Sequence, residues 1–157
     1  MAEQNLNELQ KVRRNKLKDL QDAGKNPFEI TKYDVTHHSM EIKDHYEELE
    51  GQEVTVAGRM MFKRVMGKAS FCNIQDLQGK IQANVARDEI GQDSYKDFKK
   101  YDAGDIIGIK GTVFKTKTGE ISIHAAEVVL LSKSLQILPQ SLHPCHTLLS
   151  LVDSLYR

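Results

Sequence analysis

Four side chains near the middle of the chain have the types and the spacing that could bind a flat, hydrogen-bonding ring. Phe71 precedes Asn73 by two residues, and Gln82 precedes Asn84 by two. Because alternate side chains of a β-strand point to opposite faces, each pair would lie on one face of a strand. One aromatic ring among amides suits stacking a base and reading its edge, which is how single-stranded nucleic acid is bound. The alternative is that a loop or helix covers the Phe71 ring.

These side chains need three successive strands, and the stretch 54–86 has the alternation that predicts them. Its apolar positions define an inward face, and they are Val54, Val56, Met60, Cys72, Ile74, Ile81, Ala83 and Val85. The opposite face should meet water, and Arg59 of the first strand falls on it. Gly67 supplies the turn between the first two strands, and residues 76–79 supply the next turn.

The rest of the chain supplies the elements that would close these strands into a barrel. Residues 92–100 predict a short helix with Tyr95 and Phe98 on one side, 105–116 a fourth strand and 120–130 a fifth. Three strands, a short helix and two strands is the element order of an OB-fold, a five-stranded Greek-key barrel whose second and third strands form its usual ligand face. The predicted fold is therefore mainly β with some α.

An N-terminal amphipathic helix is predicted within residues 1–25, ahead of the barrel domain at 53–131. Its leucines share one face, and they are Leu6, Leu9, Leu17 and Leu20. At about 100° per residue, Lys11, Arg14 and Lys18 lie together on the opposite face as a basic stripe. The stripe is either a solvated outer face or, if a polyanion docks nearby, a set of phosphate contacts.

Two further segments complete the predicted organisation. Residues 26–52 connect the helix to the barrel and hold a short acidic helix that begins with Ser39 as its N-cap. Residues 132–157 form a tail. The adjacent His37 and His38 project in different directions and lack partners at a recognisable spacing, so they predict no metal site. The tail has three further potential ligands without a fourth, and they are His143, Cys145 and His146.

Composition limits the class of protein. A chain of 157 residues can hold one domain of usual size plus an appendage. Its 22 Lys and Arg balance its 22 Asp and Glu, so the net charge does not indicate a nucleic-acid binder. The basic residues nevertheless cluster along the chain. Two distant cysteines form no disulfide framework, and no apolar run reaches the roughly 18 residues that span a membrane. We therefore expect a soluble cytoplasmic protein.

Three runs of sequence follow the N-terminal helix in order: GRMMFKRVMGKASF, LQGKIQANVARD and GDIIGIKGTVFKTKTGEISIHAAEVVLLSKSLQILP. With them, residues 5–139 resemble the anticodon-binding domain of a bacterial-type class II lysyl-tRNA synthetase, the lysine–tRNA ligase family. The resemblance implies that the partner is the anticodon stem-loop of tRNA(Lys), whose anticodon is rich in uridine. After Pro139 the chain departs from the family, and the class II catalytic motifs are missing. The resemblance therefore implies a fragment that is inactive alone and binds no cofactor, since ATP and Mg²⁺ belong to the family's catalytic domain.

Carried over residue by residue, the resemblance gives roles to five side chains. Phe71 stacks on an anticodon base, while Gln82 and Arg64 contact the central uridine. Arg59 supports the same face, and Glu120, in the turn between the last two strands, contacts an anticodon base. Uracil offers an acceptor at O4 and a donor at N3, but a rotated Gln amide matches cytosine equally well. A guanidinium has donors only, so it can hydrogen-bond to a carbonyl but not to an amine. Arg64 and Gln82 together could therefore select uridine.

Two other functions remain open from the residues themselves. A general OB-fold binder of single-stranded nucleic acid would need several stacking rings along a basic groove, whereas only Phe71 is well placed in the sequence. A dimerisation or interaction module would instead bury Phe71 and the leucine face on a partner. The family resemblance implies that complete synthetases are homodimers.

Overall fold

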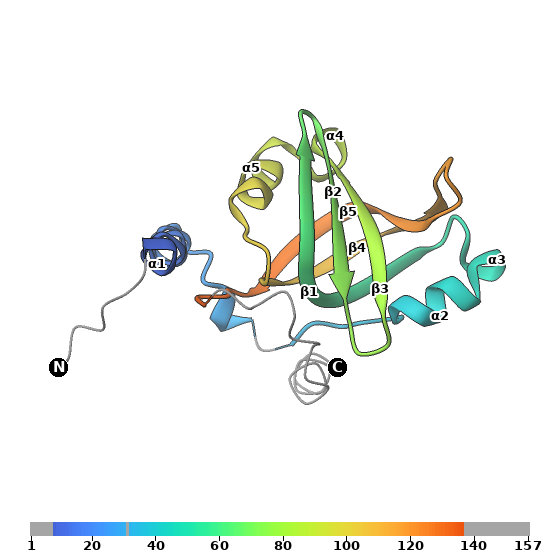
Figure 1. The fold of residues 1–157 in the computed structure, drawn as a ribbon, viewed down its shortest axis with the longest axis horizontal. Helices are drawn as coiled ribbons and strands as arrows, with labels where there is room; N and C mark the ends of the chain where they lie inside the picture. Colours follow the sequence, from blue (N-terminus) through green and yellow to red (C-terminus); the bar gives the residue numbers. More distant parts are fainter. Residues whose placement is uncertain (1–7, 31, 137–157) are drawn as a thin grey trace.

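Five strands close into a barrel in the computed structural model, which describes residues 8–30 and 32–136 (Figure 1). The strands are β1 (Glu53–Met66), β2 (Ala69–Gln75), β3 (Lys80–Ala86), β4 (Ile106–Lys115) and β5 (Ile121–Ser132). They follow the order β1-β2-β3-β5-β4 around the barrel, and β4 pairs back onto β1. The β3–β5 pair is parallel, because helices and β4 intervene between them, and the other pairs are antiparallel. The predicted fold class, a five-stranded OB-fold barrel after an N-terminal helix, is confirmed.

Alternation of apolar and polar side chains puts one row of each strand inside the barrel. Along β2 and β3 every second residue is buried. The barrel core includes Val54, Val56, Met60, Cys72, Ile74, Ile81, Val85, Ile107, Ile109 and Ile123. Each fully buried aliphatic side chain of this size stabilises the fold by about 1.5–3 kcal/mol. Burial also raises the pKa of the Cys72 thiol to about 12, so this cysteine is a core side chain and a poor nucleophile.

Helix α5 (Gln92–Lys100) lies against one end of the barrel (Figure 1). Its Tyr95 and Phe98 point into the core, as their spacing predicts, and each is at most 2% exposed. The Tyr95 hydroxyl is hydrogen-bonded to Ser70 Oγ of β2 at 2.8 Å. Lys63 of β1 donates to backbone carbonyls at the C-terminal end of α5, where the helix dipole favours a cation. The helix is therefore fixed to β1 and β2, the two strands that carry the predicted site.

The connecting segment holds two short helices where the sequence predicts one. The short elements are η1 (Pro27–Glu29), α2 (Ser39–Asp44), α3 (Tyr46–Leu49) and an unpredicted α4 (Arg87–Ile90). The N-cap of α2 is His38 and not Ser39, and the His38 N–H donates to Glu41 Oε2 at 2.8 Å. Ser39 is buried, and its N–H and hydroxyl donate to the Asp76 carboxylate at 2.6 and 2.7 Å. The prediction for Ser39 is wrong because the residue is needed to tie α2 to the β2–β3 turn.

The extended segment before α2 packs on β4 at Gly108. A Cβ at this position would lie 2.3–2.8 Å from atoms of the Tyr33 ring, so only glycine lets the ring lie directly on the strand. Burial raises the pKa of Tyr33 to about 12, and the charge of Glu127 adds to the effect. The Tyr33 hydroxyl is therefore a neutral group of the folded protein up to strongly alkaline pH.

Helix α1 (Glu8–Asp22) is held to the barrel more by polar contacts than by apolar burial. None of its side chains is fully buried; Leu20 packs at the edge of the core, whereas Leu9 is 56% exposed. Arg13 instead donates to two backbone carbonyls outside the helix, each at 3.1 Å. The predicted leucine face is thus only partly buried, and Leu6 lies outside the described residues. No helix in the described part of the chain, α1 included, has the length and apolar character to cross a membrane.

A cluster of buried charges, which we name the Lys133 clamp, fixes the chain as it leaves β5. The Lys133 ammonium lies 2.9 Å from both Asp105 carboxylate oxygens and 2.8 Å from Asp102 Oδ2. Asp102 also binds Lys16 of α1 at 2.8 Å, and the Ser134 N–H donates to Asp105 at 2.9 Å. Burial alone would raise the pKa of Asp102, but hydrogen bonds from Lys133 and Lys16 outweigh it and lower that pKa. Removing one partner of such a cluster costs about 3–5 kcal/mol, because it leaves a buried charge uncompensated.

Candidate nucleic-acid interface

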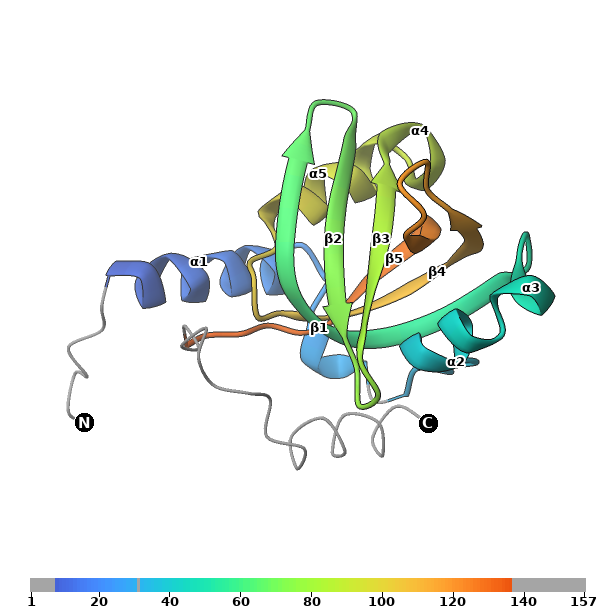
Figure 2. The ribbon, with the colours of Figure 1, turned by 45° about the vertical axis from the view of Figure 1, so that its right-hand side comes forward.

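An open cavity of about 420 Å³ lies on the outer face of the barrel. Its walls are outward side chains of β1, β2 and β3 and the turn between β4 and β5: Phe62, Arg64, Met66, Phe71, Asn73, Gln82, Thr116, Lys117 and Thr118. Figure 2 shows the three strands side by side, with the β4–β5 turn close to β3. The cavity therefore lies on the face where the sequence places Phe71 and Gln82.

A β-bulge in β1 turns Phe62 and Arg64 toward this cavity. Met60 is the last residue in register with β2 before the bulge, and the next paired residue is Phe62, opposite Asn73. Met61 is therefore an extra residue on β1. Without it, alternation from the buried Met60 would point Phe62 and Arg64 into the core. The bulge thus decides which side chains of β1 reach the site.

Cross-strand pairing brings the predicted side chains together. Arg64 on β1 lies directly opposite Phe71 on β2, and Asn73 on β2 lies directly opposite Gln82 on β3. Arg64 is exposed, and within the described residues its guanidinium has no hydrogen bond or ion pair, so its donors are available to a ligand. The half-buried ring of Phe71 lies beside those donors.

Ser122 of β5 holds the amide of Gln82 in one orientation. The two residues pair in the parallel β3–β5 register, and the Ser122 hydroxyl donates to Gln82 Oε1 at 3.0 Å. Ser122 is 1% exposed. Reversing the amide would break this hydrogen bond. Gln82 therefore presents its Nε2 donors to the cavity.

The β4–β5 turn forms the opposite wall of the cavity. Thr116 Oγ1 is hydrogen-bonded to Thr118 Oγ1 at 2.9 Å and accepts the Glu120 N–H at 3.0 Å. Gly119 has a φ of +89°, a left-handed conformation that glycine adopts without strain. These features hold the exposed Lys117 at the tip of the turn. The wall thus carries two hydroxyls and a cation.

Two of the five residues to which the family resemblance gives roles do not line the cavity, and Asn84 does not line it either. Arg59 precedes the bulge, and its guanidinium donates to the Gly104 carbonyl at 2.8 Å. Burial lowers the pKa of Arg59, although the charge of Asp105 opposes this effect. Glu120 lies 3.7 Å from the ammonium of Lys43, at the base of the turn. The structure therefore brings together Arg64, Phe71 and Gln82 and leaves Arg59 and Glu120 outside that group.

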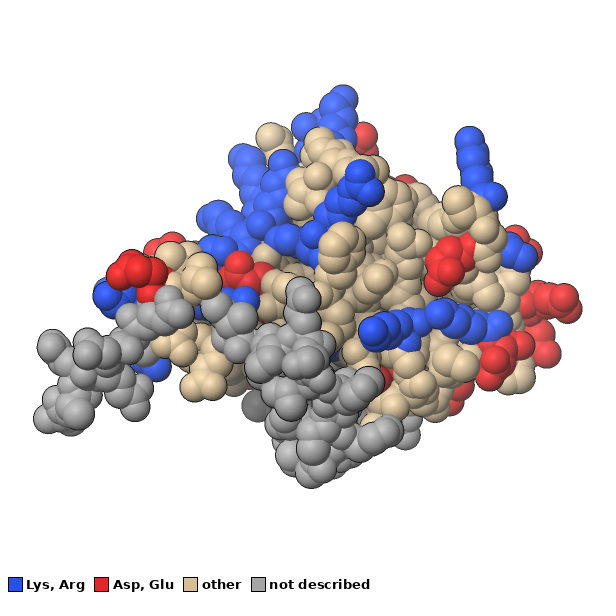
Figure 3. All heavy atoms as spheres, viewed as in Figure 1, with Lys and Arg blue, Asp and Glu red and all other residues tan. Residues whose placement is uncertain are grey.

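Basic side chains gather over α5 and the neighbouring end of β1 (Figure 3). The exposed ones of α5 are Lys96, Lys99 and Lys100. The stripe of α1 is on a helix that extends sideways from the barrel (Figure 2). Within the stripe Lys11 lies 3.2 Å from Glu8, while Arg14 and Lys18 are exposed. The basic surface beside the barrel face is therefore supplied by α5 and β1.

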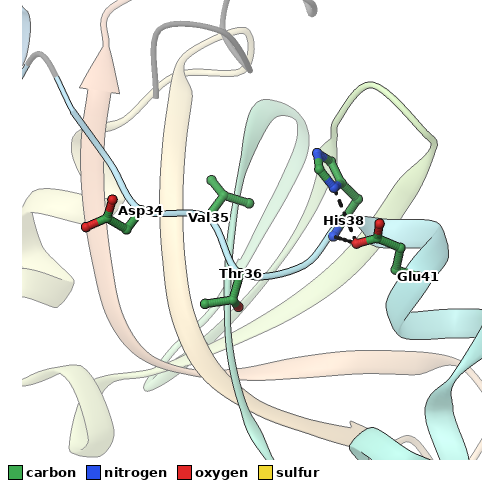
Figure 4. Close-up of a pocket in the computed structure, with 5 residues that line it drawn as sticks. All are labelled: Asp34, Val35, Thr36, His38 and Glu41. Atoms are coloured by element: carbon green, nitrogen blue, oxygen red, sulfur yellow. Dashed lines mark hydrogen bonds and ion pairs between the residues drawn. The ribbon is translucent and has the colours of Figure 1, made fainter. Parts of the chain in front are cut away.

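A second cavity, of about 370 Å³, lies along the segment before α2 and is lined by Asp34, Val35, Thr36, His38 and Glu41 (Figure 4). Figure 4 shows His38 and Glu41 together at one end, with Asp34 apart from them. The hydrogen bond from the His38 N–H lowers the pKa of Glu41, so this carboxylate is committed to capping α2. No group of three or more His, Cys, Asp or Glu in residues 8–30 and 32–136 could hold a metal ion. Outside the described residues are the three candidate ligands of the tail, His143, Cys145 and His146.

Comparison with known proteins agrees with the barrel fold. Residues 54–131 match the family model described as an OB-fold nucleic acid binding domain, and the similar curated proteins are lysine–tRNA ligases. The domain at residues 54–131 belongs to the OB-fold anticodon-binding family. The chain is 53% identical to the lysine–tRNA ligase of Clostridium botulinum over 141 residues, which are 90% of this chain and 28% of the relative. The ligases of Clostridium novyi and Clostridium kluyveri are 51% and 50% identical over 90% and 91% of the chain. The chain thus spans 28% of the length of these relatives.

Several side chains of the anticodon-binding barrel line the cavity without having been predicted as site residues: Phe62, Met66, Thr116, Lys117 and Thr118. The three turn residues had a usable signal, because the loop between the fourth and fifth strands is a usual ligand contact of OB-folds. Phe62 had none. Its outward position depends on the bulge, which no feature of its composition announces.

Proposed function

We propose that the anticodon-binding barrel holds the anticodon loop of tRNA(Lys), with one base stacked on Phe71 and its edge bound by Arg64 and Gln82. The observation that carries this proposal is the meeting of one ring with two donor groups in a single open cavity. Similarity to lysine–tRNA ligases supports the choice of tRNA(Lys).

Selection of uridine follows from hydrogen-bond polarity. Uracil has a carbonyl where cytosine has an exocyclic amine. Arg64 has donors only, and Gln82 turns its Nε2 donors to the cavity while one lone pair of its carbonyl accepts from Ser122. The O4 carbonyl of uracil accepts hydrogen bonds from these groups, whereas the amine of cytosine would face other donors. The free energy of binding should therefore favour uracil by about 1–3 kcal/mol. Stacking on Phe71 adds about 1–3 kcal/mol for any base.

Positive charge supplies the part of the affinity that does not depend on sequence. In this proposal Lys117 at the tip of the β4–β5 turn and the exposed lysines of α5 contact phosphates of the bound loop. Lys11, Arg14 and Lys18 contact phosphates of the stem in this proposal. Each neutralised phosphate releases counterions, so binding should weaken as salt rises.

The role of the chain within a complete lysine–tRNA ligase is also a proposal. We infer that the chain supplies recognition of tRNA, in the cytoplasm, and that ATP, Mg²⁺ and lysine bind elsewhere in such an enzyme. The anticodon site itself needs no cofactor in this proposal. Complete enzymes would be homodimers, in line with the family resemblance.

The test is a titration of the 157-residue chain with two anticodon hairpins that differ only in having U or C at the central position. At one fixed salt concentration the U hairpin should bind more tightly. Phe71→Ala should weaken both hairpins by about ten- to hundredfold, since stacking is indifferent to base identity. Its melting temperature should not change, because the ring lies on the outer face. Equal affinity of the unmutated chain for U and C would contradict the proposal, as would an unfolded Phe71→Ala.

A further inference from the structure

A second aromatic ring, Phe62, lies in the anticodon cavity, and neither the fold nor the bulge alone explains why it is aromatic. Its side chain is 55% exposed on the outer face of the barrel. Burying a phenyl ring normally stabilises a fold, so an exposed ring in a concave site points to a ligand. Within the described residues neither Phe62 nor Phe71 packs on another aromatic ring. No other ring therefore competes with a base for the exposed part of Phe62 in the described part of the chain.

The register of β1 and β2 fixes how the two rings are arranged. Phe62 lies opposite Asn73, and Arg64 lies opposite Phe71, two residues further along both strands. The two rings occupy one diagonal of this square, and Arg64 and Asn73 occupy the other. Each ring therefore has a polar side chain on either side of it, one along its own strand and one across.

The spacing of the two strand positions that carry the rings fits two bases that do not stack on each other. Diagonal neighbours on one face of an antiparallel pair are about 7–8 Å apart. That is about twice the 3.4 Å rise per nucleotide of a stacked strand. Loops read by proteins have their bases splayed out and stacked on protein side chains instead. Two successive loop bases would therefore reach one ring each.

We propose that Phe62 is a second base-stacking platform, which holds the base next to the one on Phe71 in the same RNA loop. The proposal rests on the proposed function and adds a subsite to it. The cavity would then bind two successive bases, and Asn73 would lie beside the second one. A general track for single strands would need further rings beyond these two, and the cavity lining contains none.

The test combines protein variants with abasic hairpins. Phe62→Ala, Phe71→Ala and the unmutated 157-residue chain are titrated with the lysine anticodon hairpin and with three versions that each lack one anticodon base. Phe62→Ala should weaken the intact hairpin about 5- to 150-fold. The loss should disappear for the hairpin that lacks one outer anticodon base and persist for the hairpin that lacks the central base. Phe71→Ala should show the opposite dependence.

Three further variants separate stacking on Phe62 from a general effect of mutating the β1–β2 hairpin of the protein. Val65→Ala removes an apolar side chain that is 42% exposed on the same strand and outside the cavity, and it should leave all affinities unchanged. Phe62→Trp keeps an aromatic face and should retain binding, whereas Phe62→Leu keeps only apolar volume and should lose it.

Other results would overturn the subsite. If Phe71→Ala weakens the hairpin and Phe62→Ala does not, the second platform is wrong and the proposed function stands. An equal loss for all three abasic hairpins would show that Phe62 contacts no particular base. Conversion of a dimer to a monomer by Phe62→Ala, seen by sedimentation, would assign the ring to a contact between copies. If the unmutated chain binds no hairpin, the proposed function fails as well.

Discussion

Ser122→Ala should reduce the ability of the barrel to distinguish uridine from cytosine while leaving the fold intact. The substitution removes the hydroxyl that donates to Gln82 Oε1 at 3.0 Å. In the unmutated chain the Gln82 amide must give up this bond before it can turn its carbonyl toward a cytosine amine. Without the hydroxyl the Gln82 amide can turn freely and hydrogen-bond to either uracil or cytosine.

The magnitude follows from the single bond that is removed. A neutral intramolecular hydrogen bond contributes about 0.5–1.5 kcal/mol net, and each 1.36 kcal/mol is a tenfold change. The ratio of affinities for the U and C hairpins should therefore fall by about 2- to 13-fold. Most of the change should be tighter binding of the C hairpin. Discrimination by Arg64 should remain, because its donors do not depend on Ser122.

The assay is the fixed-salt titration of the two hairpins, with Ser70→Ala as the matched control. Ser70 is another fully buried serine of the barrel, bonded to the Tyr95 hydroxyl at 2.8 Å and outside the cavity. Its loss should lower stability without changing the U to C ratio. Combining Ser122→Ala with Gln82→Ala should give the ratio of Gln82→Ala alone, since the two residues act through one contact. An unchanged ratio in Ser122→Ala, or an equal fall in Ser70→Ala, would refute the reasoning.

Three further predictions concern the rest of the chain. Replacing Lys11, Arg14 and Lys18 with Gln should weaken all tRNA hairpins alike and flatten the slope of log affinity against log salt by about two to three; an unchanged slope would mark the stripe as a solvated face. The purified 157-residue chain should show no lysine-dependent exchange of pyrophosphate into ATP, because the family's class II motifs are absent from its sequence, and exchange above background would contradict this. Stability should fall as pH rises from 10 to 12, because the pKa of Tyr33 is raised from 10.0 to about 12 by burial and the unfolded chain then loses this proton first; denaturant titrations of Tyr33→Phe across the same range should show a smaller fall.

The alternation of apolar residues and the turn residues were enough to predict β2, β3 and α5. In each of these elements the apolar residues recur without a break, and they are the residues that the structure buries. The bulge in β1 was beyond this reasoning. Met60, Met61 and Phe62 are all apolar, so no polar residue marks where the alternation reverses. A strict period of two starting from the buried Met60 would put Arg64 in the core. In the sequence, only the family resemblance placed Arg64 and Phe71 in one site. The bulge is the physical reason that both side chains lie on the outer face.

Sequence patterns also could not predict the contacts between residues far apart in the chain. The leucines of α1 define a face, but a periodic pattern does not say whether anything covers it, and Arg13 and Lys16 attach the helix instead. Likewise Gln82 and Ser122 are separated by 40 residues and meet through the parallel β3–β5 pair. The amide of Gln82 was ambiguous in the sequence for this reason.

The Lys133 clamp has a mechanical consequence for anything joined to the barrel beyond β5. A pull on the chain at Ser134 reaches Asp105 and α1 before it reaches any strand, because Asp105 accepts the Ser134 N–H and Arg13 holds the Ser134 carbonyl. Hydrogen bonds are lost once donor and acceptor separate by more than about 3.5 Å, so the joint should stay stiff under small loads and yield abruptly under large ones. The direction in which the backbone departs is therefore set relative to the barrel axis.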